Sequence, residues 1–263
     1  MRFNVNFIRL IYKSFLFGFP RIVYNPTNVN VFHSSYSVLP YSTYVNFKLD
    51  HNEYNYVNDY LMDKHGGLNL EKIKIEDNEN NEYYLSINMY NCSSPLFELL
   101  GKDIVTRCEI NTYVKNELNE TGTLILDYTS NMLSMDPVNI FKKPEICEFK
   151  INENEITCLS QSISQEFVIN YNISDNDKCF NVSEELHEYT DNIFYKNGVY
   201  DKLYYDRTLI HGITNIPSSN SVHFRIGGIV LTNPSSIFYF KDKLNFAGGM
   251  WYNIFDKIDP SKK

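Results

Sequence analysis

Two runs of alternating side chains, joined by a turn, restrict the fold more than any other part of the chain. The first run covers residues 104–115, residues 119–122 supply the turn, and the second run reads TLILDYTS. Alternate side chains of a strand point to opposite faces, so this segment predicts an antiparallel hairpin. One face of the first run carries Cys108, Ile110, Thr112 and Val114. The other, more polar face carries Arg107, Glu109, Asn111 and Tyr113. We expect the polar face to be solvated, as is common in antiparallel sheets, and the alternative is that it lines a polar cavity.

Further strands and a few helices follow from the same reasoning. A helix is expected after Asp50 or Asn52, which can cap it, with Gly66-Gly67 as its end. Two more helical segments are expected after Ser130 and from Asn181, and Asn197-Gly198 is a strong hairpin signal. Strands are expected at residues 41–49, 68–75, 83–90, 145–151, 154–159, 165–173, 199–211, 221–233 and 238–240. We therefore predict a β-rich α+β domain built on antiparallel meanders.

The chain of 263 residues is expected to divide into residues 1–40, an N-terminal helix and an extended covering segment, and residues 41–263, a single domain. Residues 1–49 contain no Asp or Glu, and residues 1–17 are amphipathic with Arg2, Arg9 and Lys13. We expect this helix to pack on the domain. An organelle-targeting peptide within residues 1–20, or a helix lying on a membrane surface, remains an alternative.

Composition excludes several functional classes. A net charge of −8 argues against nucleic-acid binding, which needs a basic face. Six scattered histidines predict no metal site, and the absence of GxSxG, Walker and GxGxxG patterns predicts no cofactor. Five irregularly spaced cysteines without a secretory signal favour an intracellular, cytoplasmic protein with reduced thiols. The oligomeric state stays open, a homo-oligomer included.

The pair Lys142-Lys143, followed by Pro144, is the feature that most suggests chemistry. One interpretation is structural, because cations are favoured at the end of a helix and proline is an ordinary helix stop. The other is catalytic, because a neighbouring ammonium and burial both lower the pKa of a lysine toward the neutral amine that a nucleophile requires.

The order of these elements resembles the acetoacetate decarboxylase fold, including its non-decarboxylating YqjF-like relatives. The fragments that carry the resemblance are FPRIVY, INMYNCSSPLFELL, EINTYVK, LILDYTS and the lysine pair. The resemblance implies Lys142 as the nucleophile, Lys143 as its perturbing partner and Glu98 as a cavity glutamate. The family's cavity arginine and second glutamate fall near Ser42 and Leu85. Neither of these positions carries a charge. We therefore expect the substrate to be bound by the polar face of residues 104–115, through Arg107, Glu109 and Tyr113.

The resemblance implies a small-molecule-binding protein that decarboxylates a β-keto acid through a lysine Schiff base. A catalytically silent relative, acting as a small apolar ligand binder or an interaction module, is the alternative. A third hypothesis is an unrelated β-rich protein held at a membrane by residues 1–17.

Overall fold

The computed structural model describes residues 35–248 except for 65–67, 76–79, 94–96, 99–100, 118, 134–141, 163–164, 176, 181–191, 196–198, 206–209, 214–220, 227 and 242. The described part of the chain forms one helix and two sheets. The elements are β1 (Ser35–Val38), β2 (Thr43–Lys48), α2 (His51–Lys64), β3 (Leu68–Leu70), β4 (Tyr84–Ser93), β5 (Val105–Asn116), β6 (Thr121–Ser130), β7 (Ile146–Asn152), β8 (Glu155–Gln161), β9 (Gln165–Asn172), β10 (Lys178–Phe180), β11 (Asn192–Tyr195), β12 (Val199–Tyr205), β13 (Ile210–Ile213), β14 (Ser221–Ile226), β15 (Ile229–Leu231), β16 (Ser236–Tyr239) and β17 (Leu244–Gly248).

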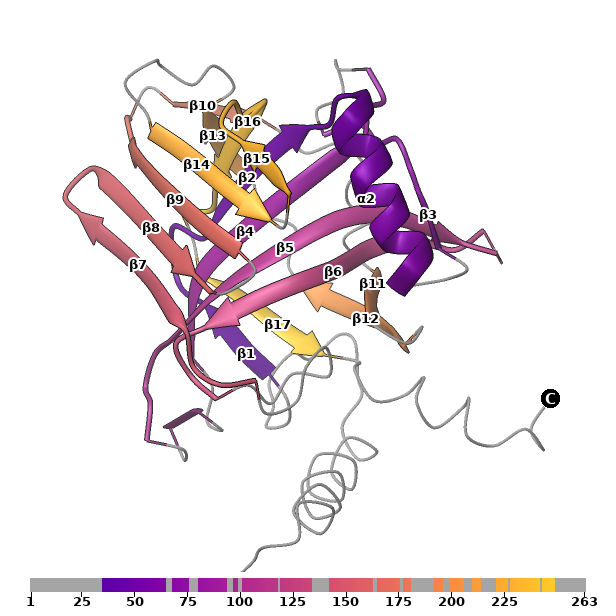
Figure 1. The fold of residues 1–263 in the computed structure, drawn as a ribbon. Helices are drawn as coiled ribbons and strands as arrows, with labels where there is room; N and C mark the ends of the chain where they lie inside the picture. The colour runs from indigo at the N-terminus through magenta and orange to yellow at the C-terminus, as the bar shows by residue number, and fades with distance from the viewer. Residues whose placement is uncertain are drawn as a thin grey trace, which may run out of the picture.

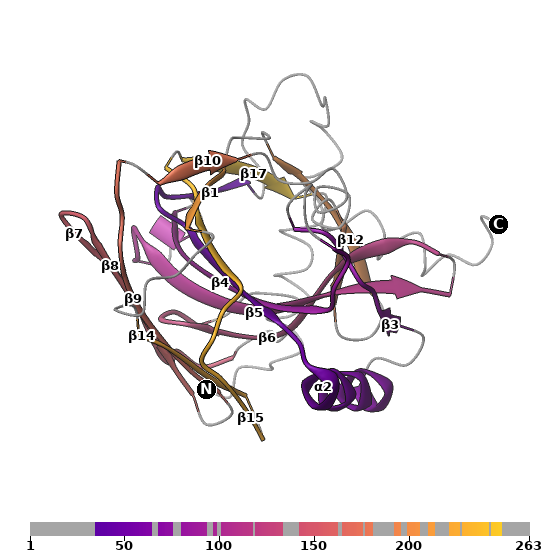
Figure 2. The ribbon, with the colours of Figure 1, turned by 90° about the horizontal axis from the view of Figure 1, so that it is seen from above.

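The larger sheet closes on itself. Successive pairings run from β4 to β1, β17, β12, β11, β6 and β5, and β5 pairs again with β4. Figure 2 shows the resulting ring of strands seen from above. A closed sheet has an inner and an outer face, and both are shielded from solvent if something covers the outside.

The smaller sheet, ordered β15-β14-β9-β8-β7, supplies part of that cover. Figure 1 shows it lying across the outer face of β4, β5 and β6, beside α2. The main hydrophobic core fills the space between the sheets, with Ile87 and Ile110 from the barrel and Phe167 and Phe224 from the smaller sheet. The rings of Phe47 and Phe224 stack at 6.0 Å across this interface. The apolar side chains of the alternating strands therefore point outward, away from the interior of the barrel.

Helix α2 begins with a capping box. Asp50 Oδ1 accepts hydrogen bonds from the backbone N–H groups of Asn52 and Glu53 at 2.7 and 2.9 Å, and Glu53 Oε2 accepts from the Asp50 N–H at 2.7 Å. These contacts satisfy backbone donors that the first turn of a helix leaves without partners. Val57 is buried in the main core, and Tyr54 packs against that core. The predicted cap at Asp50 is confirmed.

The predicted β-rich α+β class and most of the predicted strands are confirmed. Residues 199–211 divide into β12 and β13, and the strand expected at 68–75 ends at Leu70. Residues 35–38, assigned from the sequence to a covering segment, form β1 within the ring. Strands β11 and β12 pair as an antiparallel hairpin, and the predicted turn at Asn197-Gly198 between them lies outside the described residues. Residues 1–34, most of the helical crossing after Ser130 and the segment from Asn181 lie outside the described residues.

Among the described residues, no helix has the length and apolar character that a transmembrane helix needs.

Candidate functional site

The inner face of the barrel carries two rows of mostly polar side chains across β2, β4, β5 and β6. Residues that face each other in neighbouring strands define each row. The first row is Tyr44, Asn88, Glu109 and Tyr128. The second row is Asn46, Ser86, Asn111 and Ile125. Cross-strand neighbours have their Cβ atoms within about 5.5 Å of each other, so each row is a continuous surface.

The polar face of β5 is not solvated, in contrast to the expectation from the sequence. The side chains of Arg107 and Glu109 are 16% and 12% exposed, and Asn111 and Tyr113 are buried. This correction has a topological cause. Ring closure turns the mainly polar face of β5 toward the interior, where the other strands of the ring shield it from water. The alternative interpretation, that this face lines a polar interior, describes the structure.

Arg107 and Glu109 form an ion pair on this inner face. Arg107 Nε lies 2.6 Å from Glu109 Oε1, and Tyr90 Oη donates a hydrogen bond of 2.8 Å to the same oxygen. Arg107 Cζ also lies 4.4 Å from the centre of the Tyr128 ring, which is within the range of a cation–π contact. The pairing of charges is what permits these two residues to be mostly buried.

A β-bulge in β6 directs Tyr128 into the barrel. The pairing of β5 with β6 jumps from Ile110 with Asp127 to Asn111 with Ile125, so that Leu126 has no partner in the register. Without the extra residue, Tyr128 would share the outer face with Leu124. Bulges commonly re-aim a side chain in this way. Here the bulge brings the Tyr128 ring beside Glu109 and turns Asp127 outward.

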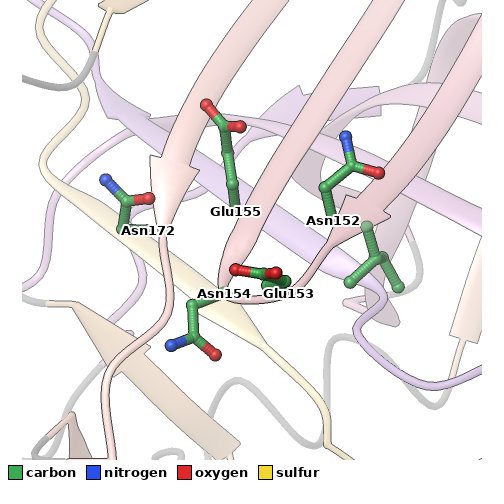
Figure 3. A pocket seen from close by; sticks show the side chains of 6 residues that line it. Asn152, Glu153, Asn154, Glu155 and Asn172 are labelled. Carbon is green, nitrogen blue, oxygen red and sulfur yellow. The ribbon is translucent and has the colours of Figure 1, made fainter.

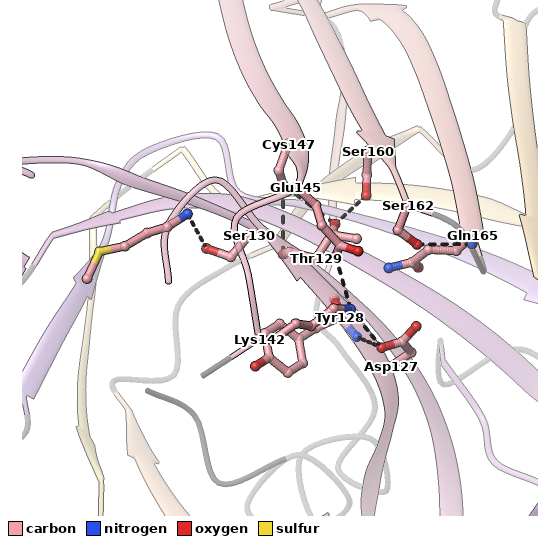
Figure 4. A network of polar contacts seen from close by, with 11 residues as sticks. Asp127, Tyr128, Thr129, Ser130, Lys142, Glu145, Cys147, Ser160, Ser162 and Gln165 are labelled. Atoms are coloured by element: carbon pink, nitrogen blue, oxygen red, sulfur yellow. Dashed lines mark hydrogen bonds and ion pairs between the residues drawn. The ribbon is translucent and has the colours of Figure 1, made fainter. Parts of the chain in front are cut away.

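Lys142 lies at the edge of β6 beside this bulge (Figure 4). Its Nζ is 3.2 Å from Asp127 Oδ1 and 3.1 Å from Glu145 Oε2, and it donates a hydrogen bond to the Tyr128 carbonyl oxygen. The same Nζ lies 5.1 Å from the centre of the Tyr128 ring. The Lys142 side chain is 15% exposed. The two predicted cations Arg107 and Lys142 therefore contact one aromatic ring.

The other predicted catalytic residues lie apart from this cluster. Lys143 is exposed, next to exposed Pro144, and Glu98 is exposed in the connection between β4 and β5. The structure thus brings together Lys142, Arg107 and Glu109 around Tyr128. Tyr113 lies on the same face of β5 farther along the strand, where its hydroxyl is 3.1 Å from Ser86 Oγ. Lys142 and Lys143 are not a buried pair.

A surface pocket lies at the β7–β8 turn and involves none of the predicted site residues. Figure 3 shows it lined by Asn152, Glu153, Asn154, Glu155 and Asn172. Lys142 and Glu145 precede the start of β7, and the pocket lies at its other end. At about 3.3 Å per residue, the strand separates the two places by roughly 20 Å. The pocket is therefore distinct from the inner face of the barrel.

Comparison with solved structures identifies the architecture. MppR, an enduracididine biosynthesis enzyme, complexed with the condensation product of pyruvate and imidazole 4-carboxaldehyde, superposes with a TM-score of 0.52 at 9% identity, over 86% of this chain and 94% of MppR. MppR complexed with pyruvate gives a TM-score of 0.51 at 9% identity, over 88% and 96% of the two chains. An acetoacetate decarboxylase-like enzyme from Sphingomonas wittichii RW1 gives 0.50 at 8% identity, over 83% and 92%. The chain has the acetoacetate decarboxylase-like fold. No protein-family model and no curated protein matches the sequence.

In this acetoacetate decarboxylase-like fold, the family's cavity arginine and second glutamate were expected near Ser42 and Leu85, where this chain has no charged residue. Leu85 is fully buried in the main hydrophobic core, on the outer face of β4. Ser42 is buried directly before β2, and its carbonyl oxygen accepts a hydrogen bond of 3.0 Å from the Phe240 N–H. Neither supplies a charge to the interior. Arg107 and Glu109 are two charged residues that β5 contributes to the interior of this acetoacetate decarboxylase-like barrel.

Sequence reasoning missed Tyr128, Asp127 and Glu145 as neighbours of Lys142. Tyr128 and Asp127 were visible in the motif LILDYTS, but their faces depend on the bulge, which no residue type marks. Glu145 is three residues after Lys142, on the other side of Pro144. Its N–H donates to the Ser130 carbonyl oxygen at 2.8 Å, which fixes the connection into β7 against the edge of β6.

Four buried cysteines of the acetoacetate decarboxylase-like domain are free thiols: Cys92, Cys108, Cys147 and Cys158. Burial raises the pKa of Cys92 and of Cys147 from 9.0 to about 12, and it also raises the pKa of Cys108 and Cys158. The thiolate is the reactive form, so these thiols are inert in the folded protein.

We expect iodoacetamide at pH 8 to leave these four cysteines unmodified in the native protein and to label them after unfolding, as read by peptide mass spectrometry. Rapid labelling of Cys92 or Cys147 under native conditions would contradict this burial.

The stability of the protein is expected to fall as the pH rises from about 9 to about 12. The pKa of Cys92 and Cys147 is higher in the folded protein than in the unfolded chain, so the unfolded chain loses these protons first.

Proposed function

We propose that the protein binds a small keto acid in the interior of the barrel, with Arg107 pairing with the ligand carboxylate. The observation that carries the proposal is that Arg107 and Lys142 lie against the same Tyr128 ring, at 4.4 and 5.1 Å from its centre. A cation for the carboxylate and an amine for the carbonyl are the two groups that a keto acid requires. MppR, which shares the fold, has been solved complexed with pyruvate, a keto acid.

The chemistry that follows is addition of the Lys142 amine to the ligand carbonyl. Loss of water gives an iminium, and with a β-keto acid the electrons of the carbon–carboxylate bond pass into that iminium as carbon dioxide leaves. The resulting enamine takes up a proton, and hydrolysis returns the ketone and the lysine. An amine must lose its proton before it attacks. Asp127 and Glu145, at 3.2 and 3.1 Å from Nζ, are the groups positioned to accept that proton.

A catalytically silent binder is the second candidate, and the same contacts favour it. Two carboxylates and the Tyr128 carbonyl oxygen contact Nζ, so Lys142 has structural partners that do not depend on a catalytic role. Lys143, the predicted perturbing ammonium, is exposed. In this candidate Lys142 secures the connection into β7, and the keto acid binds without a covalent bond.

Borohydride reduction separates the two candidates. The protein is incubated with pyruvate or acetoacetate, reduced with sodium borohydride and analysed by peptide mass spectrometry, alongside Lys142→Met and Lys143→Met variants. An adduct on Lys142 that disappears only in Lys142→Met supports the Schiff-base mechanism. No adduct, in a protein that binds the ligand, leaves the silent binder. An adduct on Lys143 alone overturns the assignment of the nucleophile.

A further inference from the structure

Two buried amides on the inner face lack a hydrogen-bond partner for one atom each. Asn88 and Asn111 are 6% and 4% exposed, and Oδ1 of each has no partner among the residues that the structure describes. Asn88 Nδ2 donates a hydrogen bond of 2.9 Å to Tyr44 Oη. This bond fixes the orientation of the amide, whose Oδ1 accepts no hydrogen bond from the described residues. An unpaired buried polar atom is unfavourable, and native proteins contain few of them.

A third amide on the same face, Asn46, differs from these two in its hydrogen bonds. Asn46 is an amide on the same face with both ends satisfied, since its Nδ2 donates to Ser236 Oγ at 3.1 Å and its Oδ1 accepts from Ser86 Oγ at 2.6 Å. Asparagine is also depleted in strands. Asn88 and Asn111 therefore differ from Asn46 in their Oδ1 atoms, which accept no hydrogen bond from the described part of the chain.

The two amides flank Glu109. Asn88 is the direct cross-strand partner of Glu109, and Asn111 follows Glu109 by two residues on the same face of β5. Asn88 and Asn111 are therefore diagonal neighbours, about 7–8 Å apart in such a sheet, which one small group can bridge. Two amide oxygens beside a carboxylate form a surface that accepts hydrogen bonds. A hydroxyl or an amino group is its complement.

We propose that Asn88 and Asn111 are specificity residues that accept hydrogen bonds from a hydroxyl or amino group of the ligand, so that the ligand is a hydroxy- or amino-substituted keto acid. This inference rests on the proposed function. Asn88 is a diagonal cross-strand neighbour of Arg107, about 7–8 Å away in such a sheet. A carbon chain of four to six atoms extends over about that distance, from a carboxylate at Arg107 toward a donor group at Asn88 and Asn111.

Isothermal titration calorimetry with 2-oxobutanoate and 4-hydroxy-2-oxobutanoate tests this, because the two probes differ by one hydroxyl group. We expect the wild-type protein to bind the hydroxylated probe about tenfold more tightly, as one additional hydrogen bond provides. Asn88→Leu and Asn111→Leu are expected to bring the ratio of the two dissociation constants near one. Asn170→Leu, on β9 of the other sheet, serves as the matched control and is expected to keep the ratio.

The outcomes distinguish failure of this inference from failure of the proposed function. Equal binding of both probes by the wild-type protein overturns this inference and leaves keto-acid binding standing. A preference that survives in Asn88→Leu and Asn111→Leu also overturns it, because the hydroxyl group is then recognised elsewhere. No binding of either probe overturns the proposed function and this inference with it. Thermal unfolding of each variant establishes that it is folded, and the wild-type ratio decides the inference even if a variant does not fold.

Discussion

Replacing Lys142 with methionine is expected to destabilise the protein by about 2–3 kcal/mol. Removal of one partner from a buried ion pair leaves its neighbours as uncompensated charges, which costs about 3–5 kcal/mol when burial is complete. Asp127 and Glu145 are 27% and 23% exposed, so water screens part of that penalty. The substitution also removes the hydrogen bond to the Tyr128 carbonyl oxygen at the edge of β6.

Lys143→Met is the matched control, because it removes the same charge one residue away. Lys143 is exposed, and exposed substitutions of this kind change stability by about 0.5 kcal/mol or less. Urea unfolding followed by circular dichroism measures both variants. Similar losses of stability for the two substitutions would mean that the contacts of Lys142 with Asp127, Glu145 and the Tyr128 carbonyl oxygen do not stabilise the fold.

Asn46→Leu and Asn111→Leu are expected to have opposite consequences for stability. Asn46 is 1% exposed, and its loss leaves Ser236 Oγ without its amide donor and Ser86 Oγ without its amide acceptor. We expect a loss of about 1–3 kcal/mol. Asn111→Leu removes a buried oxygen that has no partner, with little change of shape, so stability is expected to stay constant or rise by about 1 kcal/mol.

Differential scanning calorimetry without added ligand compares these two variants directly. Both positions lie in one row of the inner face, so the comparison keeps strand type and burial nearly equal. A large loss of stability in Asn111→Leu would show that Asn111 has a structural partner, and it would remove the basis for assigning it a role in specificity.

The sequence predicted the local elements of this fold because their signals are local. The alternation in β5 and β6, the Asp50 cap and the pairing of β11 with β12 each depend on a few neighbouring residues. Ring closure depends on β1, β11 and β17, which contain four, four and five residues, and on pairings between distant parts of the chain. Strands this short carry little periodicity, so their place in the ring was not visible.

The candidate site was predicted in part for the same reason. Arg107 and Glu109 were singled out from the pattern of one strand, and their common face follows from the period of two. Which of the two lysines approaches that face depends on the path of the chain between β6 and β7. The role of Tyr128 depends on the bulge at Leu126, and the unpaired atoms of Asn88 and Asn111 appear only when all neighbours are in place.

The most direct test of keto-acid binding in the barrel is isothermal titration of pyruvate into the wild-type protein and into Arg107→Met, with Arg225→Met on β14 of the smaller sheet as the control. We predict saturable binding that Arg107→Met weakens by about 10- to 100-fold, as loss of a charged hydrogen bond implies, and that Arg225→Met leaves unchanged. Absence of binding, or equal binding by wild type and a folded Arg107→Met variant, would contradict the proposal.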